Sequence, residues 1–168
     1  MTDTPVQDQP AASGGVQNLP IIVHAQYVRD ISFENPHAPN SLRPGQDAPR
    51  MDVNINLDAR PIEDPQIKNL YEVVLKLTAR ADRKDYPVFV AEVQYAVTVS
   101  LPEVPENQHH PLLLVEVPKL AFPFARKVLA DLTQEGGYPP LMIGPVDFYS
   151  MYMNRFAKKP EALKQAAN

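Results

Sequence analysis

Two neighbouring stretches decide the fold, "LYEVVLKLTARA" at residues 70–81 and "VFVAEVQYAVTVS" at residues 88–100. Successive side chains of a strand point to opposite faces, so apolar residues at every second position predict a strand with one face against a core. Those positions are Tyr71, Val73, Leu75 and Leu77 in the first stretch and Phe89, Ala91, Val93, Tyr95, Val97 and Val99 in the second. Because only the short "DRKDYP" separates the two stretches, they predict an antiparallel hairpin. The opposite, mixed face of the second stretch is a candidate binding surface.

Two further strands are expected before this hairpin. "MDVNINLDA" at 51–59 alternates apolar residues with asparagine and aspartate, which predicts a sheet with one solvated face. "IIVHAQYVRDISFE" at 21–34 is the other strand, and the proline-punctuated segment 35–49 predicts a long loop between them. Strict alternation places Val28, Asp30, Ser32 and Glu34 on one face and Arg29, Ile31 and Phe33 on the other. Asp30 and Glu34 therefore face either water or a partner.

The second half of the chain changes to a helical period. After a loop at 101–111 we expect a short extended apolar run, "LLLVEVPKLAF" at 112–122, and then a helix from about Pro123 to Glu135, which "EGG" terminates. "YPPLMIGPV" at 138–146 predicts another loop. Asp147 is then a candidate N-cap for a helix over "FYSMYMNRFAKK".

Length and composition bound the class of protein. The chain has 168 residues, which suits one domain; we place it at 21–157, between flexible tails at 1–20 and 158–168. A net charge of −4 with no block of Lys or Arg argues against nucleic-acid binding. No secretory signal and no apolar run of about 20 residues is present, so neither export nor membrane insertion is expected. The absence of cysteine fits a reducing compartment, and we expect a cytoplasmic protein.

No catalytic or metal-binding motif is visible. The chain lacks G-x-S-x-G, H-E-x-x-H and a glycine-rich phosphate loop, and His109 and His110 are adjacent residues without further ligands at metal-binding spacing. We therefore expect no enzyme activity, no metal and no cofactor. Two alternatives stay open: a small-ligand domain that uses the Glu92 face or the His109 loop, and an oligomeric adaptor for one folded partner.

Five segments occur in the order and approximate spacing of a known family. They are "DISFENPHAP", "YEVVLKLTARA", "VFVAEVQYAV", "PKLAFPFARKVLADL" and "GGYPPLMIGPVDFYSMYMN". Over residues 21–157 the chain resembles the bacterial export chaperone SecB. The resemblance implies an α+β subunit with a four-stranded antiparallel sheet and two main C-terminal helices, assembled as a homotetramer, a dimer of dimers. It also implies an ATP-independent holdase that keeps precursor proteins unfolded and delivers them to the motor SecA.

The resemblance assigns an acidic patch on the outer face of the sheet to SecA. The matching positions are Asp30, Glu34 and Glu92, with Val90 beside them, where the family often has leucine. The zinc of that contact belongs to SecA. The simpler alternative is that Asp30 and Glu34 only protect an edge strand against association with other strands.

The resemblance places unfolded clients in a groove between the second helix, the long crossover loop and nearby strands. The positions carried over are Tyr152, Met153 and Phe156 on the helix and Val53 and Ile55 near the loop, with Phe89 and Tyr95 as weaker candidates. Methionine and aromatic side chains suit varied clients because they repack at small cost. A plain core role is an equally good interpretation of Ile55, Phe89 and Tyr95. The crossover loop is slightly longer than in familiar members and lacks the tryptophan that some carry.

Overall fold

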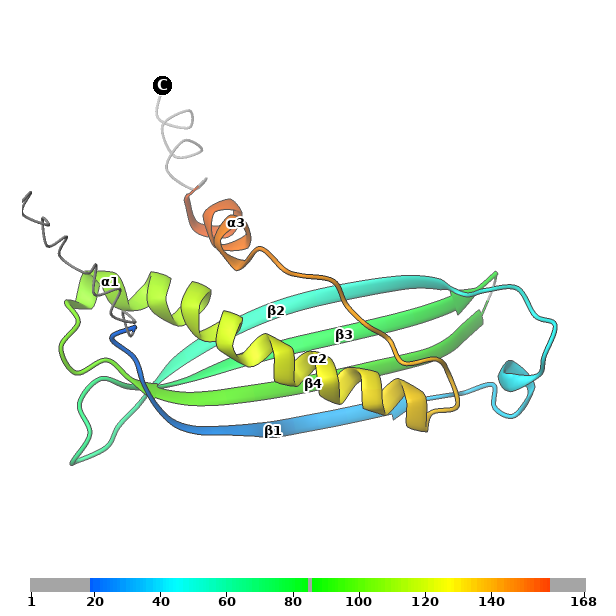
Figure 1. Ribbon diagram of the computed structural model, residues 1–168, viewed down its shortest axis with the longest axis horizontal. Coiled ribbons are helices and arrows are strands. Elements are labelled where there is room, and N and C mark those ends of the chain that lie inside the picture. Colours follow the sequence, from blue (N-terminus) through cyan, green and yellow to red (C-terminus); the bar gives the residue numbers. More distant parts are fainter. Residues whose placement is uncertain (1–18, 85, 158–168) are drawn as a thin grey trace, which may run out of the picture.

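The computed structural model describes residues 19–84 and 86–157, so most of the two predicted tails lies outside the described residues. Its elements follow one another from strands to helices (Figure 1). They are β1 (Ile22–Glu34), the 3-10 turn η1 (Asn40–Leu42), β2 (Arg50–Ile62), β3 (Leu70–Arg83), β4 (Tyr86–Ser100), α1 (Glu106–Pro111), the π-helical segment η2 (Leu112–Glu116), α2 (Val117–Glu135), α3 (Phe148–Tyr152) and the π-helical segment η3 (Met153–Ala157). The α+β class is confirmed.

The four strands form one antiparallel sheet in the order β1-β4-β3-β2. The predicted hairpin is β3 and β4, in which Leu75 lies opposite Tyr95 and Leu77 opposite Val93. Lys84 at the hairpin tip has a φ of 50°, a left-handed conformation of the kind that tight turns require. β1 and β2 occupy the two edges, so both edge strands of this sheet present unpaired backbone groups within the described subunit.

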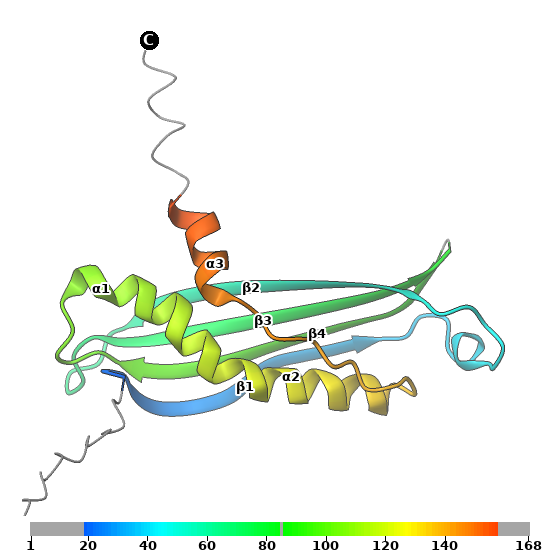
Figure 2. The same ribbon diagram turned by 45° about the horizontal axis from the view of Figure 1, so that its top comes forward.

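A long helix lies across one face of the sheet, which we call the inner face (Figures 1 and 2). The alternate residues of β3 and β4 that the sequence places on the apolar face pack against α2. Fully buried members of this core include Leu75, Leu77, Val93, Val97, Val99, Val117, Ala125 and Leu129. The opposite face, which we call the outer face, carries the polar residues of the same strands. The sequence-predicted two-sided sheet is thus confirmed.

The structure corrects the predicted facing of β1. Val28 lies opposite Tyr95 but Asp30 lies opposite Gln94, so a β-bulge at Arg29 breaks the alternation. Val28 therefore points to the inner face and Arg29 to the outer face, the reverse of the expectation. Asp30, Ser32 and Glu34 keep the predicted outer facing. The bulge is not visible in the sequence, because an extra residue in one strand shows only in the pairing with its neighbour.

The structure also corrects the start of the first long helix. The run at 112–122 is helical rather than extended, and α1, η2 and α2 follow one another without a break from Glu106 to Glu135. Pro111, Pro118 and Pro123 led the sequence analysis to expect a later start, because a proline removes one helical hydrogen bond. Burial of Leu113, Leu114, Val115, Val117 and Ala121 outweighs those lost bonds. The predicted end is confirmed, with Gly137 at a φ of 88° just after the helix.

The last helix begins where the sequence predicts. The Asp147 carboxylate accepts a hydrogen bond from the Ser150 backbone N–H at 2.9 Å, which makes it the N-cap of α3. The Ser150 hydroxyl also donates to this carboxylate, and the two hydrogen bonds hold the pKa of Asp147 below its ordinary value. α3 and η3 lie beside η2, at the β2 side of the sheet (Figures 1 and 2). Among the described residues, none of the helices is both long enough and apolar enough to cross a bilayer.

Candidate functional site

The register of β1 and β4 places the predicted SecA contacts on one surface. Asp30 lies opposite Gln94, Ser32 opposite Glu92 and Glu34 opposite Val90. Residues that oppose each other across a strand pair share a face, and so do residues two apart along a strand. Asp30, Glu34, Val90 and Glu92 therefore gather on the outer face at one end of the β1–β4 pair. Asp30 and Glu34 are exposed, while Val90 and Glu92 are half-buried.

Glu92 differs from the other two acids because it has a basic neighbour. Its carboxylate accepts from the Lys76 ammonium at 2.7 Å, and Gln94 also donates to it. The hydrogen bond from Lys76 is the main reason that the pKa of Glu92 lies below its ordinary value, against the opposing effect of burial. Glu92 is thus a fixed anion whose charge is partly compensated. The exposed Asp30 and Glu34 dominate the negative charge of this end.

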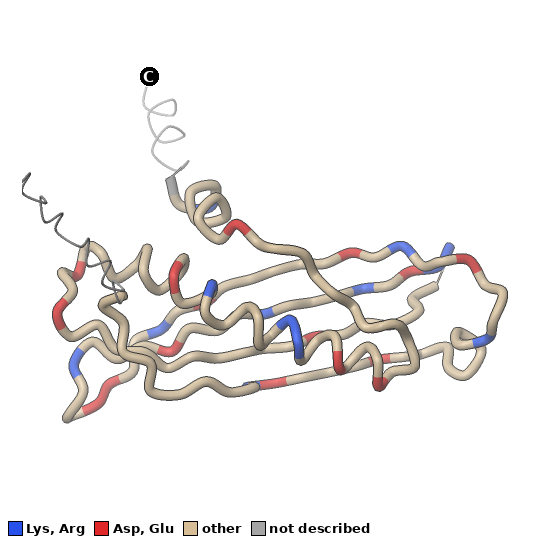
Figure 3. The backbone as a smooth tube through the Cα atoms, in the orientation of Figure 1, with Lys and Arg blue, Asp and Glu red and all other residues tan. Residues whose placement is uncertain are grey.

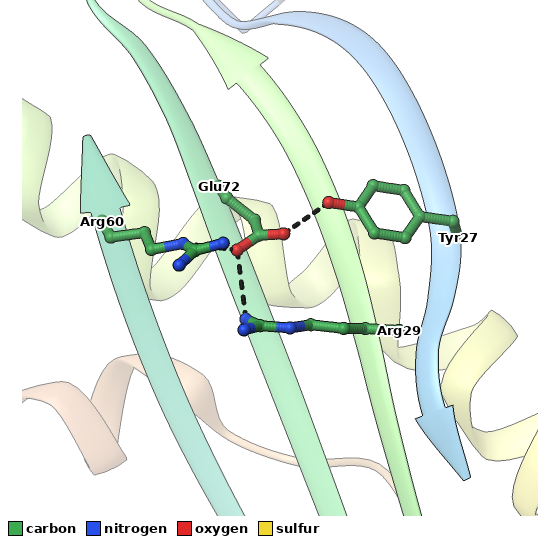
Figure 4. Close-up of polar contacts among 4 residues, drawn as sticks. All are labelled: Tyr27, Arg29, Arg60 and Glu72. Carbon is green, nitrogen blue, oxygen red and sulfur yellow. Dashed lines mark hydrogen bonds and ion pairs between the residues drawn. The ribbon is translucent and has the colours of Figure 1, made fainter. Parts of the chain in front are cut away.

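A second polar cluster, formed by Tyr27, Arg29, Arg60 and Glu72, joins three strands on the same outer face (Figure 4). We call it the Glu72 cluster. The carboxylate is buried, with 4% of the residue exposed, and it accepts from Arg29 at 3.1 Å, from Arg60 at 2.7 Å and from the Tyr27 hydroxyl. Burial alone would raise the pKa of Glu72, but the hydrogen bonds from Tyr27 and Arg60 and the charge of Arg29 outweigh it, so the pKa is lowered.

In the sequence, Glu72 appears only as a polar residue between Tyr71 and Val73, on the face opposite the apolar one. The four members of the cluster come from β1, β2 and β3, and their meeting depends on the bulge that turns Arg29 outward. Figure 3 shows acidic and basic residues interspersed along the strands rather than gathered into one block. The outer face is therefore a mosaic in which the acidic excess is local, which agrees with the small number of acids predicted to contact SecA.

The inner face carries an apolar hollow of about 320 Å³ at the end where β2 begins. We call it the inner-face hollow. Its lining residues are Pro49, Met51, Arg83, Phe89, Tyr138, Pro139, Pro140 and Leu141. The lining comes from the end of the crossover loop, the β3–β4 hairpin and the segment after α2. A larger hollow of about 660 Å³ lies around the hairpin tip, but Arg50, Asp52, Arg80, Asp82 and Lys84 line it and make it highly polar.

The inner side of β2 leads from this hollow toward α3. Met51, Val53, Ile55 and Leu57 alternate onto the inner face, because they lie opposite Ala81, Ala79, Leu77 and Leu75 of β3. We call these four residues the β2 track. Met51 and Val53 are 37% and 36% exposed, whereas Ile55 and Leu57 are half-buried. At 3.3–3.4 Å per residue, the β2 track is about 20 Å long.

The helical candidates for client contact lie at the far end of the β2 track. Met153 and Phe156 are each 38% exposed, and Tyr152 is half-buried. The His110 ring packs edge-on against the Phe156 ring, and the Nδ1 atom of His110 lies 3.0 Å from the Tyr152 hydroxyl. Arg155 donates to the Leu57 carbonyl at 3.3 Å, which ties η3 to β2. Leu57 lines a small hollow together with Tyr152 and Phe156, so the α3–η3 residues lie at the end of the strand face that carries Val53 and Ile55.

Phe89 and Tyr95 are placed differently. Phe89 is 3% exposed and stacks on Phe33 with ring centroids 5.5 Å apart, so it belongs to the core and touches the inner-face hollow only as its floor. Tyr95 is 8% exposed and stacks on Phe124 at 6.2 Å, away from the β2 track. No pattern in the sequence marks Tyr138–Leu141 as part of a site, because a loop is placed by the elements it joins rather than by its own pattern.

The histidines serve structural contacts. His109 is buried, with Nε2 2.8 Å from the Val104 carbonyl and Nδ1 2.9 Å from the Tyr71 hydroxyl, so both ring nitrogens have partners. Within residues 19–84 and 86–157, no group of three or more His, Asp or Glu side chains is arranged to hold a metal ion. The His109 loop of the small-ligand alternative is in fact helix α1 packed against β3.

Comparison with known proteins agrees with this architecture. A family model described as preprotein translocase subunit SecB matches residues 15–159. The chain is 47% identical over 162 residues to the protein-export protein SecB of Maricaulis maris, covering 96% of this chain and 91% of that protein. It is 44% identical over 159 residues to the SecB of Caulobacter sp. strain K31, covering 94% of each.

A solved structure shares the fold. It is a SecB-like chaperone of Mycobacterium tuberculosis in complex with a ChAD peptide from an antitoxin, with a TM-score of 0.57 at 17% identity over 75% of this chain and 90% of that one. The family match and the two relatives extend over nearly all of the sheet and helices described above. The chain therefore belongs to the SecB family of protein-export chaperones.

Proposed function

We propose that this chain is an ATP-independent holdase in the cytosol that keeps precursor proteins unfolded and delivers them to SecA. The observation that carries the proposal is the apolar surface formed by the inner-face hollow, the β2 track and the exposed Met153 and Phe156. An unfolded chain offers scattered apolar side chains, and an elongated surface about 20 Å long or more can hold several of them at once. The peptide-bound SecB-like chaperone supports a client of this kind.

The β2 track suits an extended client for a second reason. β2 is an edge strand, so the backbone groups along its free edge can pair with an added strand. Its side chains on the inner face can then contact apolar residues of that strand. Backbone pairing is insensitive to sequence, and methionine adapts to different partners. Together these properties favour broad rather than selective recognition, which is what a chaperone for many precursors requires.

The outer face supports the contact with SecA. Asp30 and Glu34 are exposed next to Val90, while the nearby Glu92 is held by Lys76, so a short basic segment would find both charge and some apolar area there. Exposed ion pairs contribute only about 0–1 kcal/mol each, which suits a contact that must form and dissociate quickly. Because α2 covers the opposite face, a client on the inner face leaves these acids accessible (Figures 1 and 2).

A homotetramer would cover apolar surface that one subunit leaves exposed. Val28, which is 43% exposed, and Ile31, which is 49% exposed, lie on the inner face of the edge strand β1. Phe124 of α2 is 51% exposed and stacks on Tyr95, the residue opposite Val28. Exposed apolar surface that runs from an edge strand to a helix is typical of a subunit interface. We infer that a second copy of this chain occupies it, which would join several client surfaces in one particle.

Client capture is tested by light scattering during dilution of a chemically denatured export precursor. The full chain at stoichiometric amount should delay aggregation without ATP. Val53→Asp should weaken this protection, because it places a charge in the β2 track. Leu19→Asp, which changes a 44% exposed apolar residue at the start of the described chain, is the matched control and should protect like the wild type. Undelayed aggregation with the folded wild type would refute the holdase function.

The SecA surface is tested with a triple variant, Asp30→Asn, Glu34→Gln and Glu92→Gln. Its affinity for SecA, measured by calorimetry, should fall by tenfold or more if each acid contributes toward the upper end of about 0–1 kcal/mol. The matched control is Asp52→Asn, Asp58→Asn and Glu63→Gln, which removes the same charge from the β2 side. Equal losses in the two variants would show that only net charge matters, and a parallel loss of client capture would contradict the separation of the two surfaces.

A further inference from the structure

The crossover loop, residues 35–49, contributes Pro49 to the wall of the inner-face hollow and is held by hydrogen bonds at two places. At its start, the Tyr138 hydroxyl lies 3.0 Å from both the Asn35 side-chain oxygen and the Ser41 hydroxyl, and Ser41 donates to Asn35 at 2.9 Å. Ser41 is buried, with 3% exposed. This first fastening joins the loop to the segment that follows α2.

Arg83, the last residue of β3, makes the second fastening. Its Nε donates to the Asp47 carbonyl at 2.7 Å, and its Nη1 donates to the Ser41 carbonyl at 3.3 Å and to the Gln46 side-chain oxygen. Gln46 in turn donates to the Asn40 carbonyl at 2.6 Å and to the Arg43 carbonyl at 3.1 Å. One half-buried guanidinium therefore organises the loop from residue 40 to residue 47.

The acceptors of Arg83 are two backbone carbonyls, the Gln46 side-chain oxygen and the Tyr86 hydroxyl at 3.4 Å, rather than a carboxylate. Hydrogen bonds from a charged donor are stronger than neutral ones, but these four neutral acceptors hold the guanidinium less firmly than a paired anion would. Tyr86 adds a contact, since its hydroxyl lies 3.2 Å from the same Gln46 oxygen. The fastening is thus strong enough to order the loop and still able to open.

The same arginine is also part of the wall. Arg83 lines the inner-face hollow together with Pro49 and Met51, and these two residues follow Asp47 closely in the chain. Release of the Asp47 carbonyl would free the loop as far as Pro49, next to Met51, which stays paired with Ala81 in the sheet. The position of this wall, and hence the entrance from the loop side to the β2 track, depends on the Arg83 hydrogen bonds.

We propose that Arg83 is a latch that holds the crossover loop closed against the inner-face hollow and thereby sets how fast an unfolded client enters and leaves. This inference rests on the proposed holdase function. Arg83 acts as a positioning residue, because it shapes the client surface through the loop. Weakening the latch speeds both association and release of clients while leaving the sheet and the long helix intact.

The test compares full-length Arg83→Gln and Arg83→Lys with Arg80→Gln. Arg80 lies on the same strand but faces outward and pairs with Asp82, so its replacement removes the same charge without touching the loop. Hydrogen exchange of residues 36–49 should accelerate by tenfold or more in Arg83→Gln, since loss of one hydrogen bond to a charged donor is enough for that ratio. Arg83→Lys keeps the charge but not the fork of donors and should be intermediate.

Stopped-flow fluorescence with labelled, reduced and carboxymethylated α-lactalbumin, which stays unfolded, gives the client rates. Both rate constants should rise several-fold in Arg83→Gln and stay at the wild-type values in Arg80→Gln. Unchanged loop exchange in both Arg83 variants would overturn the latch, and faster exchange with unchanged client rates would overturn its role at the entrance. If folded wild-type protein binds no unfolded probe, the holdase function fails, and the exchange experiment still decides whether Arg83 holds the loop.

Discussion

Replacing Glu72 by glutamine should destabilise the protein although Glu72 lies far from the apolar client surface. The substitution preserves shape but removes the charge that receives Arg29, Arg60 and Tyr27. Hydrogen bonds to charged groups contribute about 1.5–3 kcal/mol each when well shielded. Arg29 and Arg60 are 38% and 56% exposed at their side chains and can turn to water, so each loss should be nearer to about 1 kcal/mol. With the Tyr27 contact, we expect a loss of about 2–3 kcal/mol in the free energy of unfolding.

Urea denaturation followed by far-UV circular dichroism measures this loss, because the chain has no tryptophan for fluorescence. All samples are compared at one protein concentration, since association would add to apparent stability. Glu63→Gln is the matched control: this glutamate is exposed, and its replacement should change the free energy of unfolding by less than about 0.5 kcal/mol. Equal stability of Glu72→Gln and wild type would refute the role of the Glu72 cluster.

The pH dependence of the same experiment gives an independent check. The pKa of Glu72 is lowered in the folded protein, so its contribution is present above the ordinary value of 4.5 and is lost as the pH falls through the folded pKa. The difference between wild type and Glu72→Gln should therefore be largest near neutral pH and should shrink progressively below about pH 4.5. A difference that stays constant over this range would mean that packing, rather than charge, explains the destabilisation.

Three further predictions concern single positions. Gly136→Ala should lower the free energy of unfolding by about 1–3 kcal/mol in urea denaturation, because a Cβ there would lie 2.1 Å from the Phe33 ring. Gly144→Ala, with open space around it, should lower it less, and equal losses would contradict the packing argument. Phe124→Ser should yield smaller particles than the wild type in size-exclusion chromatography with light scattering, while the 58% exposed Tyr149→Ser should not; an unchanged particle would place the interface elsewhere. Asp147→Ala should speed hydrogen exchange in the first turn of α3, and Asp147→Asn should restore much of the protection; equal exchange rates in all three proteins would show that the cap does not stabilise α3.

The strands could be predicted because their pattern is local. The alternation of β3 and β4 reflects a face that α2 buries, and Asp147 caps a helix through a residue three positions away. The bulge at Arg29 could not be predicted, because it exists only in the register with β4. The early start of the long helix was missed for a different reason: the local cost of three prolines was visible, whereas the burial that offsets it depends on the sheet.

The two surfaces differ in how much of them the sequence could reveal. Alternation along one strand placed Asp30 and Glu34 together on its outward face, whereas only the resemblance to SecB joined Val90 and Glu92 to them. The inner-face hollow was not predicted, since its lining comes from the end of the crossover loop, the β3–β4 hairpin and Tyr138–Leu141, which are far apart in the sequence and are joined by hydrogen bonds of Arg83 and Tyr138. The resemblance implies a groove, and the structure shows which residues line the hollow that we propose for it.

The arrangement of β4 explains how one thin subunit could bind two partners at once. Val90 and Glu92 point to the outer face, while Phe89 and Val93, their direct neighbours, are buried beneath the inner-face elements. A client on the β2 track would lie on the inner face along the β2 edge, whereas the acids lie on the outer face along the β1–β4 side; the crossover loop joins these two regions, since it begins directly after Glu34 and ends directly before β2. Toward the other end of the strands, the Glu72 cluster joins β1, β2 and β3 across the outer face. Because this cluster and the strand pairing hold the sheet together independently of the loop, opening of the loop as proposed above should leave the outward facing of the acids unchanged.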